Sequence, residues 1–151
     1  MRYYASPIEE DELVSDAYKL VRKEDIGALE FEGDYIEVDV EEGETTRKDT
    51  VMNIPYNNNL QKLELTKAQF GAWCKKFIPA RKAQLSGDAQ TEFMQNAKKF
   101  VMWVDANFKE FDFFVGPTNN VDDMMLFCKH DESGAKPYFY LIIGSCPDYK
   151  Y

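Results

Sequence analysis

The chain has 151 residues, of which 44% are hydrophobic and 15% aromatic, so it suits one domain over residues 1–151 with a real core and excludes wholesale disorder. The 18 basic residues face 27 acidic ones, and the net charge of −9 disfavours broad binding to nucleic acid, because phosphate contacts need a surplus of cations. No apolar run approaches the length of a membrane helix, and neither a signal peptide nor a disulfide framework is indicated, so we expect a cytoplasmic protein without a membrane span.

The charge is unevenly distributed along the chain. Residues 1–60 carry a net charge of −10, residues 61–110 a net charge of +4, and residues 111–151 a net charge of −3. A basic central segment in an acidic protein can orient an approaching acidic partner. We therefore expect any electrostatic docking surface to lie in the central segment.

The first predicted elements are strands. Apolar residues alternate with acidic ones over residues 29–32 and again over residues 36–40, and Gly33 and Asp34 separate the two runs. This pattern predicts a β-hairpin with one solvated face. The next stretch, residues 41–49, has no aliphatic or aromatic residue and predicts a mobile acidic loop, most simply a solvated linker between strands.

The second zone predicts an antiparallel helical hairpin over about residues 66–107. Thr66 can cap the first helix, and Gln69 occupies the reciprocal capping-box position. Pro79 removes one backbone donor, so we expect it to kink or end the first helix near residue 78. Two apolar stripes follow helical spacing: Phe70, Trp73, Cys74, Phe77 and Ile78, then Phe93, Ala97, Phe100, Val101, Val104 and Phe108.

The third zone returns to strands. Residues 111–115 predict a strand that ends at Gly116 and Pro117. Residues 124–128 and 138–143 are continuous apolar runs, which predict strands that are buried on both faces. Strands, then a helix pair, then strands indicate an α+β domain. The helical hairpin is expected to cover one face of a sheet.

No catalytic constellation is indicated. His130 is the single histidine, and it lies beside a predicted turn, where an exposed surface imidazole is the simpler interpretation. Cys74 and Cys128 fall in apolar segments and are expected to act as small core side chains. With one histidine and scattered cysteines, no zinc ligand set is indicated. We therefore expect no enzymatic activity.

Two acidic clusters, at residues 39–44 and 119–123, are candidates for calcium, which binds six to eight oxygen ligands. Neither has the spacing of an EF-hand loop. The hypothesis that remains is a weak calcium site at Asn119, Asp122 and Asp123, and the alternative is a solvated acidic loop. No cofactor is required.

Several segments together resemble the translationally controlled tumour protein family. They are Asp-Glu-Leu-Val-Ser-Asp-Ala-Tyr-Lys-Leu at residues 11–20, Asn-Leu-Gln at residues 59–61 followed by Thr66-Lys67, Ala-Asn-Phe-Lys-Glu-Phe-Asp-Phe-Phe-Val-Gly at residues 106–116, and Asp-Glu-Ser-Gly-x-x-Pro-Tyr at residues 131–138. The resemblance covers most of the chain in the same order.

The chain departs from the family pattern at four places. The stretch near residues 41–49 is shorter than the usual acidic loop and lacks its glycine-rich motif. Pro117 stands where the family places a glutamate, and Asp123 stands where a small residue is usual. Glu12 is retained without its usual acidic companion.

The resemblance implies coiled β-sheets in a tent, similar to the fold of small Rab-GTPase chaperones, with an inserted helical hairpin. It also implies a non-catalytic cytoplasmic interaction protein in growth and survival, which binds calcium weakly, binds tubulin and stabilises microtubules of the cytoskeleton. The alternative that it implies is a regulator of a Ras- or Rab-like small GTPase, acting in guanine-nucleotide exchange or as a chaperone through the tent groove.

Two sets of partner-binding residues follow as hypotheses. For tubulin the candidates lie on the first helix and are Lys75, Lys76, Arg81 and Lys82; the alternative is that they only solubilise a helix face. For a small GTPase the candidate is Glu12, whose carboxylate could compete for the magnesium or the phosphate-loop lysine of the GTPase. The alternative is that Glu12 caps or solvates a turn.

Overall fold

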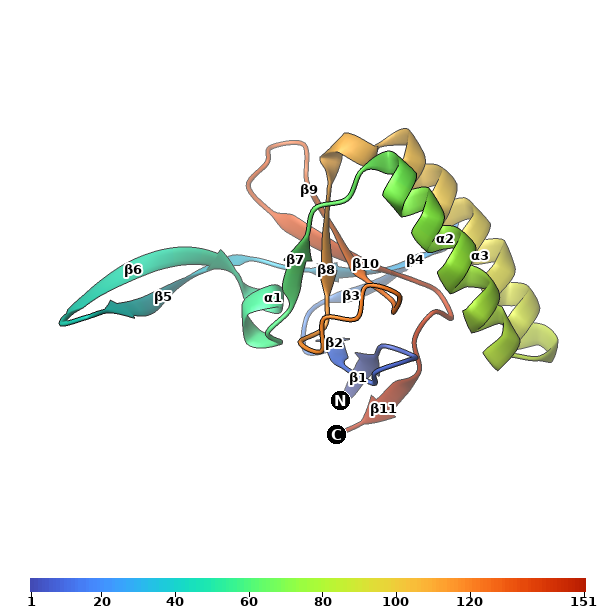
Figure 1. The fold of residues 1–151 in the computed structure, drawn as a ribbon, viewed down its shortest axis with the longest axis horizontal. Coiled ribbons are helices and arrows are strands. Elements are labelled where there is room, and N and C mark those ends of the chain that lie inside the picture. The colour runs from blue at the N-terminus through green and yellow to red at the C-terminus, as the bar shows by residue number, and fades with distance from the viewer.

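Antiparallel strands form three sheets beside one helical hairpin in the computed structural model, which describes residues 1–151 (Figure 1). In chain order the elements are β1 (Arg2–Ala5), β2 (Glu12–Ser15), β3 (Leu20–Lys23), η1 (Glu24–Ile26), β4 (Ala28–Glu32), β5 (Tyr35–Glu42), β6 (Thr45–Met52), α1 (Asn53–Asn57), β7 (Gln61–Leu63), α2 (Lys67–Gln84), α3 (Gly87–Ala106), η2 (Phe108–Glu110), β8 (Phe111–Val115), β9 (Leu126–His130), β10 (Pro137–Ile142) and β11 (Asp148–Lys150). The predicted α+β class with an inserted antiparallel helical hairpin is confirmed. None of the helices combines the length and the apolar character needed to cross a membrane.

The largest sheet has six strands in the order β3-β4-β10-β9-β8-β7. Strands β8, β9 and β10 of this sheet correspond to the three strands predicted in the third zone, and most of their residues are buried. β9 begins at Leu126, two residues later than predicted, and ends at His130. The helical hairpin lies along one side of this sheet (Figure 1). Phe127 of β9 is fully buried at the centre of the aromatic core between the hairpin and the sheet.

The helical hairpin begins at the predicted capping box. The Thr66 backbone N–H donates to Gln69 Oε1 at 2.8 Å, and the Gln69 N–H donates to Thr66 Oγ1 at 3.1 Å. Pro79 was predicted to kink or end the first helix, and an end near residue 78 is wrong, because α2 continues to Gln84. Pro79 is exposed, so its ring meets solvent, while the buried side of the helix continues through Phe77.

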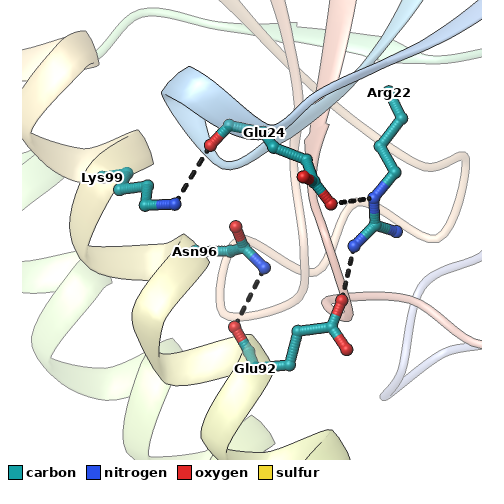
Figure 2. Close-up of polar contacts among 5 residues, drawn as sticks. All are labelled: Arg22, Glu24, Glu92, Asn96 and Lys99. Atoms are coloured by element: carbon teal, nitrogen blue, oxygen red, sulfur yellow. Dashed lines mark hydrogen bonds and ion pairs between the residues drawn. The ribbon is translucent and has the colours of Figure 1, made fainter.

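Polar contacts join the hairpin to the edge of the large sheet (Figure 2). Arg22 of β3 pairs with Glu24 of η1 at 2.8 Å and also with Glu92 of α3. Lys99 Nζ donates to the Glu24 carbonyl at 3.2 Å. Within α3, Asn96 Nδ2 donates to the Glu92 carbonyl at 3.0 Å. Because the ion pairs are exposed, each contributes little stability.

The predicted hairpin across Gly33 and Asp34 is wrong. β4 pairs with β3 and β10, whereas β5 pairs with β6. Gly33 lies against the Phe139 ring, and its N–H donates to the Pro137 carbonyl at 2.9 Å, so the chain stays in the sheet instead of reversing. The Asp34 carbonyl then accepts from the Asn53 N–H at 2.9 Å and closes the base of a separate two-stranded sheet.

The prediction of a loop over residues 41–49 is wrong in secondary structure. The segment is the tip of the β5–β6 hairpin, with Gly43 in the left-handed region at φ 61°, and it projects from the body of the molecule (Figure 1). Residues 41–42 and 45–49 pair as strands although they have no apolar side chain, because cross-strand ion pairs supplement the backbone pairing, Arg47 with Glu42 at 2.8 Å and Lys48 with Asp39 at 3.3 Å. Most of its side chains are exposed, as the polar sequence indicates.

The two termini lie side by side in the three-stranded sheet, whose order is β11-β1-β2 (Figure 1). Arg2 is the register partner of Lys150, and Arg2 Nη1 pairs with Asp148 Oδ2 at 2.8 Å. This sheet also carries Glu12, on β2.

Candidate functional site

The outer face of the helical hairpin carries an apolar groove between α2 and α3. Its volume is about 310 Å³, and its lining residues are Ile78, Met94, Ala97, Lys98, Val101 and Met102. Met102 is 64% exposed at the edge of this groove. The hairpin thus buries one face on the sheet and leaves an apolar groove on the other.

The four cations predicted on α2 have different environments. Lys75 and Lys82 are exposed and form no ion pair. Lys76 Nζ pairs with Asp122 Oδ2 at 2.8 Å. Arg81 is half-buried, since its Nε donates to the Gly144 carbonyl at 3.0 Å and Nη1 donates to Gln84 Oε1 at 3.0 Å.

Burial lowers the pKa of Arg81, and its contact with Gly144 ties α2 to the segment between β10 and β11. Arg81 therefore supports the fold, whereas Lys75 and Lys82 are free to meet a partner.

Sequence reasoning missed Lys98, which lies in the groove itself, although its spacing of four residues from Met94 and Met102 on α3 places all three on one helix face.

A second hollow, of about 410 Å³, lies where β7 leads into α2. Its lining is mostly apolar, from Leu63, Leu65, Ala72, Trp73, Val121 and Met125, together with Glu64, Gln69, Lys76 and Asp122. The Lys76–Asp122 pair joins two residues that the sequence had assigned to different sites, tubulin and calcium. Sequence reasoning missed this hollow because its residues come from three separate segments.

Two of the three predicted calcium residues, Asp122 and Asp123, have carboxylates that are engaged with the protein. Asp123 is 3% exposed, and its carboxylate accepts from the backbone N–H groups of Ile8 at 3.1 Å, Glu9 at 2.8 Å and Met124 at 2.8 Å. These bonds hold the segment between β1 and β2 against the segment before β9. The Asn119 N–H donates to the Gly116 carbonyl at 2.9 Å. The calcium site stays a prediction, and any cation there competes with these bonds.

Glu12 lies half-buried on β2, and its carboxylate accepts a hydrogen bond from the Tyr151 hydroxyl. The neighbouring Asp11 binds the loop that contains Pro117, because its Oδ1 accepts from Thr118 Oγ1 at 2.7 Å. Pro117 itself is exposed. The GTPase hypothesis stays a prediction, and in this structure the Glu12 carboxylate is bound to the C-terminal residue.

The three cysteine thiols are protonated at neutral pH. Burial raises the pKa of Cys74, Cys128 and Cys146 to about 12 in each case. A protonated thiol is a weak nucleophile, so none of them has the environment of a reactive cysteine.

His130 is not the exposed imidazole that the sequence predicts. It is half-buried, and its ring stacks on Tyr35 with the centroids 5.9 Å apart. The donor atoms of His130, Cys128 and Asp112 all lie within 4.8 Å of one another. The pairing of Cys128 with His130 can be predicted from the sequence, because residues two apart in a strand share a face. The proximity of Asp112 to these two residues cannot be predicted, since it depends on the register between β8 and β9.

The sequence model of the family described as "Translationally controlled tumour protein" matches residues 1–145. The homologous protein of Schizosaccharomyces pombe is 30% identical over 155 residues, which cover 91% of this chain and 92% of that protein. The human protein is 28% identical over 159 residues, with the same two coverages of 91% and 92%.

Two solved structures of such proteins are also similar. The structure of the translationally controlled tumor-associated protein of Schizosaccharomyces pombe superposes with a TM-score of 0.85 at 29% identity, over 100% of both chains. The structure from Caenorhabditis elegans superposes with a TM-score of 0.68 at 19% identity, over 100% of this chain and 99% of that one, and shows the shared fold.

Proposed function

Because the chain belongs to the translationally controlled tumour protein family, we propose that it acts as a non-catalytic interaction protein and binds tubulin through the outer face of its helical hairpin. The family is not known for enzymatic activity. The observation that carries the proposal is an apolar groove bordered by unpaired lysines, in a protein whose net charge is −9.

The groove and the lysines form one surface. Lys75 and Lys82 lie three residues before and four residues after Ile78, so all three side chains share a face of α2. Lys98 lines the groove from α3. An acidic protein surface such as that of tubulin can meet the lysines while an apolar side chain of the partner enters the groove.

The first prediction concerns these three lysines. In microtubule co-sedimentation at low salt, the triple variant Lys75→Gln, Lys82→Gln, Lys98→Gln should bind roughly tenfold more weakly than the unaltered chain, because exposed charge pairs contribute about 0.2–1 kcal/mol each. The difference should shrink as salt is added, since exposed charges are screened. Arg81 and Lys76 are left unchanged because their contacts belong to the fold.

The matched control is the triple variant Lys19→Gln, Lys23→Gln, Lys150→Gln. It changes the net charge by the same amount at lysines that form no ion pair and lie outside the helical hairpin. This control should bind microtubules like the unaltered chain. Equal weakening in both triple variants would contradict a localised surface and leave only an effect of net charge. Binding unaffected by the hairpin variant would contradict the proposal.

A further inference from the structure

Strand pairing brings three metal-ligating side chains onto one face of the large sheet. Asp112 of β8 is the register partner of Cys128 of β9, and His130 follows Cys128 by two residues on the same strand. Alternate residues of a strand point to the same face, so Cys128 and His130 share it. The donor atoms of Asp112, Cys128 and His130 all lie within 4.8 Å of one another.

The base of the β5–β6 hairpin covers this cluster. Tyr35 and Met52 are register partners there. The Tyr35 hydroxyl hydrogen-bonds to His130 Nε2, and Met52 Sδ lies 3.9 Å from Cys128 Sγ. Cys128 is fully buried and has no oxygen or nitrogen partner for its thiol, whereas the Asp112 side chain is 38% exposed and leaves a path to solvent.

We propose that Asp112, Cys128 and His130 form a binding site for Zn²⁺. A thiolate, an imidazole and a carboxylate are all zinc ligands, and three protein ligands with an open fourth position are a recurrent zinc arrangement. Bonds of about 2.0–2.3 Å place tetrahedral donors roughly 3.3–3.8 Å apart. The present separations, at most 4.8 Å, therefore need to contract by up to about 1.5 Å, which side-chain rotation can supply.

The surrounding residues suit this assignment. The Tyr35 hydroxyl hydrogen-bonds to Nε2 of His130, so the proposal assigns Nδ1 to the metal, and an outer partner of this kind commonly fixes a ligating imidazole. Lys62 Nζ is 3.6 Å from Asp112 Oδ1, a long contact that a divalent ion can replace. Zinc must displace the thiol proton of Cys128, as it does at other cysteine sites.

The test is Zn²⁺ binding to the whole chain, measured by competition with a chromophoric chelator under a thiol-free reductant. We expect one ion per chain, and a loss of affinity of at least about 100-fold in Cys128→Ser and in His130→Gln. The Tyr35→Phe variant should lose about 10- to 100-fold, because it removes only the partner of the imidazole. With Co²⁺ as a probe, a thiolate charge-transfer band should appear and should be absent in Cys128→Ser.

The matched control is Cys74→Ser, which removes a thiol on α2 whose pKa is also raised to about 12 by burial. It should keep the full zinc affinity and the cobalt band. His130 is half-buried, so His130→Gln gives an answer even if Cys128→Ser is poorly folded by circular dichroism. The proposal is overturned if the unaltered chain binds no stoichiometric zinc, if His130→Gln binds it equally well, or if Cys74→Ser abolishes binding.

Discussion

Replacing Phe127 by alanine should lower the free energy of unfolding by about 3–5 kcal/mol, the usual cost of deleting a fully buried phenylalanine side chain. Its ring meets five others, all edge to face, with centroid distances between 4.9 and 6.4 Å: Phe70, Trp73, Phe100, Phe111 and Phe113. These rings come from both helices of the hairpin and from the sheet beneath it. The cavity therefore opens where the hairpin and the sheet share their core, and urea denaturation followed by tryptophan fluorescence measures the loss.

Two controls separate the cavity from a general effect of substitution. Phe127→Leu keeps most of the apolar volume and should cost clearly less than the alanine variant. Met102→Ala removes an apolar side chain that is 64% exposed and should change stability by less than about 0.5 kcal/mol. A Phe127→Ala cost no greater than that of Met102→Ala would contradict the central role of this ring.

Gly27→Ala should destabilise the protein by roughly 2–6 kcal/mol for two reasons. Gly27 has φ 68°, and a left-handed backbone costs a residue with a side chain about 1–3 kcal/mol. A Cβ at this position would lie 2.2 Å from the backbone oxygen of Asn96 on α3, and overpacking of this kind costs about 1–3 kcal/mol or more. The alanine would push α3 away from η1, where the contacts of Figure 2 are made. Thermal and urea denaturation measure the total effect.

Gly43→Ala is the matched control for the part of the destabilisation that comes from the left-handed backbone conformation. Gly43 also lies in the left-handed region, at φ 61°, but nothing lies within 4 Å of its Cβ position. The Gly43 variant should therefore show only the conformational penalty. The excess cost at Gly27 measures the contact with Asn96, and equal costs at the two glycines would show that this contact is not a constraint on the fold.

The two proposed sites can be tested independently. The helical hairpin and the β5–β6 hairpin extend from opposite sides of the molecule (Figure 1). The lysine surface lies on the helical hairpin, whereas Asp112, Cys128 and His130 lie beneath the base of the β5–β6 hairpin. Zinc variants are therefore expected to leave microtubule binding unchanged, and lysine variants are expected to leave zinc binding unchanged.

Local sequence patterns were sufficient to predict the elements that are stabilised by contacts between residues close together in the chain. The capping box at Thr66 and the apolar stripes of α2 and α3 involve residues three or four apart, so they predict the helical hairpin directly. The continuous apolar runs at residues 124–128 and 138–143 likewise predict buried strands. The motif segments at residues 11–20, 59–67, 106–116 and 131–138 were sufficient to identify the family, and the family model that matches residues 1–145 confirms it.

Only the tertiary structure decided which strands pair and which charged groups remain free. Gly33 does not reverse the chain because Phe139 and Pro137 hold it, and these residues are more than 100 positions away. Arg81 is fixed by the carbonyl of Gly144, Asp123 by the N–H groups of Ile8 and Glu9, and Asp112 reaches Cys128 through strand register. Such contacts join segments that are distant in the chain and meet only in the folded domain. The composition and the hydrophobic periodicity of the sequence therefore do not predict them.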